Sequence, residues 1–500
     1  EPKLPSNVRR VLLRGLSWDA AGRFASMDEL LAELAPSRHL AGRWRTLALA
    51  GAVAVVAAGL LAVRATRRPA ELCSGAERRL SGIWDDAARE ALRASFAAAG
   101  GPGGPEAAGR AVAILDRYAS SWAATHQDAC EATRIRGEQT EAILSLRMIC
   151  LDRRLYQLGA LANLFRSSDA KLVQKSVDAA LGLPPLSSCD ASAQSLAAEP
   201  PADPAIRARI DEVGRQLDQT RALHVAGRYK PAGDLAAKAV TAAEQLGYWP
   251  ARAEALYLQG YILDQSGDPQ GAVPVLQRAL LAADAARADL DKVRTLIRLI
   301  AAEGCGLRKF DDARYYAEVA RPMLSSVGSD ELEFDLLVKI GNMLRCQGRT
   351  AEALEPYRRA LDLADRALGP GHPQKGYLLN NLSDVYAALG RSEDALRLLR
   401  QALQIISAAQ GPDHPDTAFV HYNLSEALRL AGDNKGAYEA IQQAIRIRTA
   451  TMGANHPQVA DALDRLALSL LEDGLYAEAL VECERSLASA RRRWGRTTRT

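Results

Sequence analysis

The sequence has few aromatic residues and almost no excess charge of either sign. Phe, Trp and Tyr make up 5% of the 500 residues, and 63 basic side chains are balanced by 60 acidic ones, giving a formal net charge of +3. This balance excludes the strong basic field with which proteins gather nucleic acid. Ala, Leu and Arg dominate and β-branched residues are sparse, which favours helices over strands. We therefore expect an all-α protein without a nucleic-acid partner.

Catalytic and cofactor motifs are also missing. There is no C-x-x-C pair, no glycine-rich phosphate loop, no V-A-I-K lysine, no H-R-D and no D-F-G. We therefore assign no catalytic residues and expect no cofactor. Three histidines recur at successive repeat loops, namely His372, His414 and His456. Each stands on a different loop, so they lie too far apart to share an ion with bonds of about 2 Å, and we expect no metal site.

Only one long apolar run is present. Residues 46–63 contain no ionisable group, and the run just reaches the length of a membrane span. Arginines flank the run on both sides and Trp44 lies at its boundary. This pattern predicts a transmembrane helix over 46–63, with a buried alanine-rich core helix as the alternative. Because arginine occurs on both sides, the positive-inside rule does not orient the helix.

Shifts in composition divide the rest of the chain. Residues 1–40 precede the apolar run, residues 70–190 form a predicted helical juxtamembrane domain, and residues 208–496 hold repeats. The stretch 184–207 is rich in proline, serine and alanine. Since proline cannot continue a helix, we interpret 184–207 as a linker.

The repeats are recognised by their period. Three His-Pro pairs end at the evenly spaced Pro373, Pro415 and Pro457. A second series extends the same period backwards with alanines at 232, 272, 313, 353, 395, 437 and 479. Five places before these alanines stand Gly227, Gly267, Arg308, Gly348, Gly390, Gly432 and Gly474. A glycine there would end a helix in the left-handed conformation, so the third repeat, with Arg308, is expected to turn differently.

This pattern resembles the tetratricopeptide family, and G-P-D-H-P between repeats is similar to its kinesin-light-chain-type variant. Small residues recur in register with the glycines, at Thr220, Gly260, Ala301, Gly341, Ser383, Ser425 and Ala467. They allow neighbouring helices to approach closely. The resemblance implies an α-solenoid of about seven helical hairpins, whose first helices line a groove for a peptide or partner helix.

The residue nine places before each repeat glycine is called the groove position here. An asparagine at this position could both donate to and accept from a peptide backbone, and a cation there could bind a carboxylate. The alternative is that such residues are ordinary solvated polar positions. In the last four repeats the groove candidates are Lys339, Asn381, Asn423 and Arg465, together with the neighbouring Asn380 and Tyr422.

The seven cysteines fall into two groups. Four of them precede the repeats, namely Cys73, Cys130, Cys150 and Cys189. In an oxidising compartment these four would suit two disulfides, with ordinary buried thiols as the alternative. The other three, Cys305, Cys346 and Cys483, are expected to pack as small core residues of the repeats.

The first forty residues carry a second resemblance. The segment from Val8 to Leu34 is similar to the closing helices of a bacterial Ser/Thr protein-kinase C-lobe. Its matching residues are Leu16, Asp19, Arg23, Phe24, Ser26, Met27 and Leu30. In that family the arginine at the place of Arg23 has a structural role, pairing with a buried glutamate. Ala20 departs from the family, which usually has proline there.

Together the two resemblances imply the C-terminal portion of a receptor-type Ser/Thr kinase whose catalytic lobes are absent, with Glu1 as a cut start. We then expect a cytoplasmic N-terminus, a single span in the inner membrane, and periplasmic repeats that sense or scaffold a protein or peptide ligand. The chain could also self-associate. The alternative is an independent membrane-anchored adaptor that was never a kinase.

Overall fold

The computed structural model describes residues 5–35, 73–190 and 201–497. The chain divides into two compact units, Glu1–Ser74 and Gly75–Thr500. Each unit is described by itself.

The first unit is a small pair of helices, α1 (Ser6–Gly15) and α2 (Met27–Leu34), joined through a short 3-10 turn, η1 (Ala20–Gly22). Ser26 caps the start of α2, since its hydroxyl accepts from Glu29 N–H at 3.2 Å. The Glu29 carboxylate accepts in turn from Ala25 N–H, just before the cap, at 3.0 Å. Arg23 Nε donates to the Ser17 carbonyl at 2.6 Å, which fixes the loop between the helices.

The second unit begins with a helical bundle around an aromatic core. Its helices are α4 (Asp86–Ala99), α5 (Gly104–Arg134), α6 (Glu141–Phe165) and α7 (Ala170–Leu181). Phe96 of α4 meets Phe165 of α6 edge to face, with ring centroids 5.4 Å apart. Trp122 is fully buried and donates from Nε1 to the Leu151 carbonyl at 2.7 Å. The bundle therefore has a core of its own.

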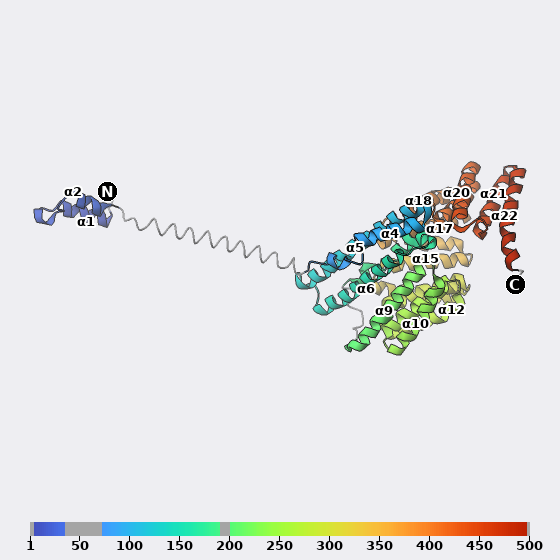
Figure 1. Ribbon diagram of the computed structural model, residues 1–500, viewed down its shortest axis with the longest axis horizontal. Helices are drawn as coiled ribbons and strands as arrows, with labels where there is room; N and C mark the ends of the chain where they lie inside the picture. The colour runs from blue at the N-terminus through green and yellow to red at the C-terminus, as the bar shows by residue number, and fades with distance from the viewer. Residues whose placement is uncertain (1–4, 36–72, 191–200, 498–500) are drawn as a thin grey trace. The chain divides into compact units, whose positions relative to one another are not determined.

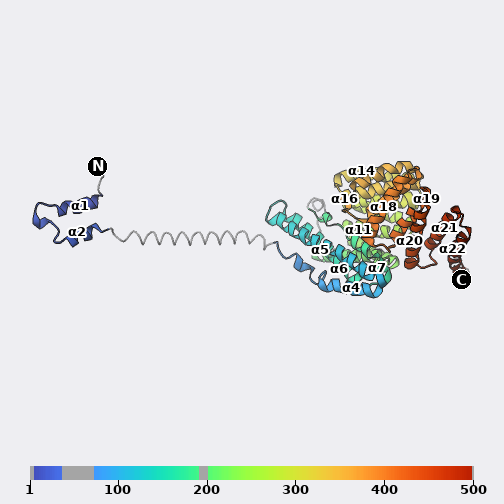
Figure 2. The same cartoon turned by 90° about the horizontal axis from the view of Figure 1, so that it is seen from above.

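A solenoid of consecutive helices follows, running from green to red in Figures 1 and 2. Each helix packs against the next along the chain. Its helices are α9 (Pro204–Val225), α10 (Tyr229–Leu246), α11 (Trp249–Gln265), α12 (Pro269–Ala285), α13 (Asp289–Ala301), α14 (Phe310–Val327), α15 (Asp330–Cys346), α16 (Leu354–Leu368), α17 (Pro373–Ala388), α18 (Ser392–Gln410), α19 (Pro415–Leu430), α20 (Asn434–Met452), α21 (Pro457–Glu472) and α22 (Tyr476–Thr497).

The repeated small residues lie where the helices approach most closely. The repeat alanines from Ala232 to Ala479 are at most 1% exposed. A Cβ added at Gly341 would lie 2.3 Å from the Tyr357 ring, and one at Gly260 would lie 2.6 Å from Leu276. The space between neighbouring helices thus admits no larger side chain at these two positions.

Left-handed residues end the first helix of each repeat. The six repeat glycines have φ between 71° and 85°, and Arg308 adopts the same conformation with φ of 58°. A π-helical turn, η5 (Ala302–Gly306), precedes Arg308 and extends α13. The third repeat therefore reaches the same left-handed turn by a different path.

The three repeated histidines are helix caps. His372, His414 and His456 each precede the proline that begins α17, α19 and α21, and each accepts from the backbone N–H two places later through Nδ1. Proline fits the first helical position because it has no N–H to satisfy there. The His-Pro pair is thus a helix-start signal.

The helices of the structure correct the predicted architecture. The described residues form twenty α-helices, in place of about seven hairpins preceded by a juxtamembrane domain and a transmembrane helix. Among these residues no helix is both long enough and apolar enough to cross a bilayer. The longest, α5 and α6, carry charged side chains along their length, such as Asp116 and Arg153. No described helix supports the predicted span or the inner-membrane location, and the segment 46–63 itself lies outside the described residues.

Cysteine pairing differs from the prediction within the repeats. Cys150 and Cys189 form a disulfide in the bundle, and Cys73 and Cys130 each take part in a disulfide. Cys305 and Cys346, expected as core thiols, form a further disulfide with a Cα–Cα distance of 5.5 Å. The π-helical turn after α13 carries Cys305 to the end of α15, where Cys346 lies. Cys483 is a free thiol.

Candidate protein-binding surface

Ion pairs connect helix α6 of the bundle with the first helices of the solenoid. Arg153 donates to both carboxylate oxygens of Glu254 on α11, at 2.7 and 2.6 Å. The same guanidinium donates to Asp218 on α9 at 3.2 Å. Arg221 of α9 completes the group, donating to Glu254 at 2.6 Å and to Asp218 at 3.0 Å. Two cations and two carboxylates thus connect α6 with two repeats.

Because this ion cluster is buried, each charged group in it depends on its partners to remain ionised. Burial alone would raise the pKa of Glu254, but Arg153 and Arg221 hold it well below its usual range. Burial likewise opposes the charged form of Arg153, while Glu254 and Asp218 raise its pKa above the usual value. The side chain of Asp218 is only 2% exposed. A carboxylate so buried must be paired to remain ionised.

Asp218 occupies the groove position of the first repeat, nine places before Gly227. It is therefore the counterpart of Asn381 and Asn423. Besides Arg153, it accepts from Gln157 Nε2 of α6 at 2.6 Å. The position that the sequence assigns to a ligand is thus filled, in the first repeat, by a helix of the same chain.

Helix α7 meets two parts of the solenoid that are far apart in the sequence. Near the start of α10, Lys175 Nζ donates to the Tyr229 hydroxyl at 3.1 Å. At the loop between α18 and α19, Gln410 Nε2 donates to Asp178 at 2.5 Å, and the His414 ring lies 3.0 Å from the Gln174 carbonyl. The bundle therefore links the first repeat to the junction between the fifth and sixth repeats.

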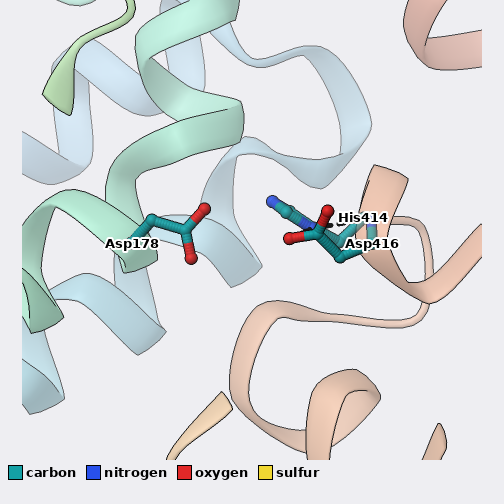
Figure 3. Close-up of side chains that lie close together, drawn as sticks. All are labelled: Asp178, His414 and Asp416. Atoms are coloured by element: carbon teal, nitrogen blue, oxygen red, sulfur yellow. Dashed lines mark hydrogen bonds and ion pairs between the residues drawn. The ribbon is translucent and has the colours of Figure 1, made fainter. Parts of the chain in front are cut away.

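Asp178, His414 and Asp416 form the one metal-ligand-type group among the described residues, with ligand atoms within 4.8 Å of one another. Figure 3 shows Asp178 facing the other two across the contact with α7. His414 Nδ1 accepts from Asp416 N–H, so Nε2 carries the proton and donates to Gln174. Asp416 also accepts from Tyr377 at 2.5 Å and from Gln410 at 3.1 Å. Because both histidine nitrogens are engaged, the arrangement suits an inter-repeat hydrogen-bond network better than an ion.

The three predicted asparagines, Asn380, Asn381 and Asn423, lie differently in the structure. Asn380 is 1% exposed and its Oδ1 accepts from Asn423 Nδ2 at 3.0 Å. Asn381 is half-buried, and its Nδ2 lies 3.4 Å from Asn342 Oδ1 on α15. Adjacent residues on a helix point about 100° apart, so only one of the pair can face the groove. Asn381 and Asn423 are on the accessible side, while Asn380 supports Asn423 from within.

The predicted cations are paired with neighbours. Lys339 lies 3.2 Å from Asp335 on its own helix. Arg465 binds Glu426 of α19 and donates to the Tyr422 hydroxyl at 2.9 Å.

The Tyr422 ring contacts two guanidinium groups. Arg465 lies 4.1 Å from its centroid and Arg448 lies 4.5 Å from it. Arg448 is itself buried and donates to the Gln458 carbonyl at 2.7 Å. These contacts fix Tyr422 between repeats.

A cavity of about 450 Å³ opens beside Asn342. Arg345 and Asp384, paired at 2.8 Å, line it together with the Cys305–Cys346 disulfide. Burial raises the pKa of Asp384, although Arg345 acts in the opposite direction. Asn342, Arg345 and Asp384 were not predicted from the sequence. Asn342 and Asp384 share one repeat position, six places before the glycine, and this periodicity could have revealed them.

Comparison with known families identifies the repeats. Residues 332–408 and 376–450 match one family model described as tetratricopeptide repeat, and residues 253–285 match another of the same description. No curated protein matches the chain.

Solved structures resemble the chain at low identity. A putative kinesin light chain from Podosopora anserina with TPR-like repeats is 18% identical, covering 50% of this chain and 99% of that one, with a TM-score of 0.30. The quorum sensor NprR from B. thuringiensis is 13% identical, covering 75% and 97%, with a TM-score of 0.46. A Rap protein complexed with competence and sporulation factor is 12% identical, covering 76% and 98%, with a TM-score of 0.46. Residues 253–285 and 332–450 therefore match tetratricopeptide repeats, and they lie within a helical solenoid that extends beyond them on both sides.

Proposed function

We propose that the chain is a protein-binding scaffold whose ligand lies along the first helices of its later repeats. The observation that carries this proposal is the Arg153 cluster. In this cluster Asp218, at the groove position of the first repeat, binds Arg153 and Gln157 of α6. The groove position can therefore hold a helix by polar contacts, and Asn381 and Asn423 offer amide groups at the same position in later repeats.

The chemistry of the later repeats supports an extended peptide or a partner helix with a polar stripe. An asparagine amide can accept from and donate to a peptide backbone, while the cavity beside Asn342 and Arg345 can receive one side chain. Lys339 and Arg465 stand at the two ends of this series, and each could exchange its present carboxylate partner for one on the ligand.

Binding can be tested with peptides selected from a displayed random library on the purified chain. Asn381→Ala is expected to weaken a selected peptide about tenfold, the usual effect of losing a bidentate hydrogen bond. The matched control is Gln401→Ala, which removes an exposed side-chain amide from the second helix α18. Equal affinities for both variants and the parent chain would contradict the proposed groove.

We further propose that the scaffold is the sensing part of a Ser/Thr kinase, with α1 and α2 as the last helices of the kinase domain. Support comes from the surface of this small unit. Trp18 is 100% exposed, and Leu13, Leu16, Met27 and Leu31 are also exposed. Five large apolar side chains on so short a segment suit helices that pack against a larger domain.

The coding sequence upstream of Glu1 tests the kinase proposal. An in-frame H-R-D followed by D-F-G is the expected result, because these motifs hold the catalytic base and the magnesium ligand. An upstream sequence without them would favour an independent adaptor and leave the peptide-binding proposal untouched.

A further inference from the structure

The last two helices can be compared with the pair before them, because equivalent positions recur with the repeat period, as Pro415 and Pro457 do. Helices α19 and α20 bind the following repeat through three polar contacts. Glu426 binds Arg465, Arg429 donates to Glu472 at 2.8 Å, and Asn434 donates to Asp473. These contacts define the direction in which a repeat meets its successor.

In the last repeat the same three positions are apolar or aromatic. Leu468, Leu471 and Tyr476 stand in place of Glu426, Arg429 and Asn434. All three are exposed, Tyr476 by 71%. The change is therefore from polar groups that have partners to apolar groups that no helix of the described residues covers.

The second helix of the last repeat shows the same exposure. Ile445 of α20 is 9% exposed and packs with Val459 and Leu463 of α21, whereas its counterpart Leu487 is 54% exposed. At the position of Leu480, which is 61% exposed, the preceding repeat has Tyr438, 39% exposed, and the repeat before that has Leu396, 9% exposed. We call Leu468, Leu471, Tyr476, Leu480 and Leu487 the terminal face.

An outer face on which no further repeat stacks is normally polar. The terminal face is instead more apolar than the stacking positions within the array. Five large apolar side chains on two adjacent helices mark an interaction surface. It continues an interface that the solenoid already uses between α20 and α21.

The apolar character of the terminal face indicates which kind of partner can bind it. A further helix of the internal type would present groups like Arg465, Glu472 and Asp473, and the leucines would leave these groups unpaired. A two-fold pairing brings one patch against the same patch of the partner, so the patch must be complementary to itself, and a neutral apolar face meets this requirement. Head-to-tail stacking is not available, because α9 at the other end is packed against α6 and α7.

We propose that the terminal face binds the same face of a second copy of this chain, forming a two-fold dimer through α21 and α22. Leucine-to-leucine contacts across the axis would remove from water the side chains that are now exposed. The terminal face does not include Arg465, the groove position of α21, so the proposed pairing and the proposed ligand use different residues of this helix.

The test is the oligomeric state of the full chain by sedimentation velocity from low to high micromolar concentration. The parent chain is expected to dimerise. Leu480→Asp combined with Leu487→Asp should raise the dimer dissociation constant at least ~100-fold, since each buried charge costs tenfold or more. Leu281→Asp is the matched control, because Leu281 is 72% exposed on α12 and lies outside the terminal face.

Circular dichroism and thermal unfolding of the three chains establish that the substitutions leave the fold intact. A parent chain that stays monomeric over the whole range would overturn the proposal. A dimer that survives the double substitution would also overturn it, and would assign the contact to another surface such as the exposed side chains of α1 and α2.

Discussion

The first repeat and the later repeats have different partners at the same repeat position. In the first repeat the groove position holds Asp218, which is paired with Arg153 and Gln157 of α6. In the later repeats it holds Asn381, Asn423 and Arg465, whose partners are side chains of adjacent repeats. One structural position therefore serves to attach the chain's own bundle at one end and stays accessible at the other. The difference lies in charge, since a buried carboxylate demands a cation and a half-buried amide does not.

The Cys305–Cys346 disulfide lies between these two regions, and its removal should give the largest loss of stability. The two cysteines are 41 positions apart in the sequence, so replacing both by alanine should lower the free energy of unfolding by about 3–4 kcal/mol. Urea unfolding of the double variant measures this loss. Cys483→Ala is the control for removal of a thiol, and an equal effect of both changes would count against the bond.

Arg153→Ala should break the attachment of α6 to the early repeats. It leaves Glu254 and Asp218 with Arg221 as their remaining cation, at an expected cost of about 2–4 kcal/mol. Hydrogen exchange should rise in α6 and α9 and remain unchanged in α19 to α22. Arg215→Ala, which removes an exposed pair with Glu212 on α9, should leave the stability nearly unchanged.

Acid should weaken the early repeats through His224. Burial lowers its pKa to about 4, with Lys175 and Arg298 adding to the effect. The unfolded chain takes up this proton near pH 6.5, earlier than the folded chain does. His224 therefore does not lower the free energy of unfolding above pH 6.5. Below that pH the free energy of unfolding falls, by up to roughly 3 kcal/mol as the pH drops towards 4. Comparing the parent with His224→Phe at pH 7 and pH 4.5 isolates this contribution, and parallel pH profiles would contradict it.

Arg308→Gly gives the smallest expected effect. A left-handed conformation costs a non-glycine residue about 1 kcal/mol, and Arg308 has a φ of 58°. The substitution should raise the melting temperature slightly, with a stability gain of about 0.5–1 kcal/mol after the contact with Phe310 is lost. A decrease in stability would mean that the arginine contributes more through its side chain than its backbone costs.

The sequence predicted those features that depend on residues close together in the chain. The left-handed turns follow from the repeat glycines, and the close helix contacts follow from the small residues such as Gly341. Helix starts at His-Pro pairs are equally local, although the histidines were interpreted only as loop residues.

Contacts between distant segments were beyond such reasoning. Arg153 lies 101 residues from Glu254 in the sequence, and Gln410 lies 232 residues from Asp178. No rule based on sequence spacing predicts either contact. Asn380 was named as a groove candidate because it stands beside Asn381, yet the helical turn directs the two side chains to different sides. The Cys305–Cys346 bond depends on the π-helical turn, which the sequence suggested only through Arg308.

Hydrogen exchange of the full chain with and without a selected peptide tests the central claim most directly. The account predicts protection in α15, α17, α19 and α21, around the groove positions from Lys339 to Arg465, with α9 and α11 unchanged. Protection of α9 and α11 together with faster exchange in α6 would contradict it, because the ligand would then displace Arg153 from the early repeats.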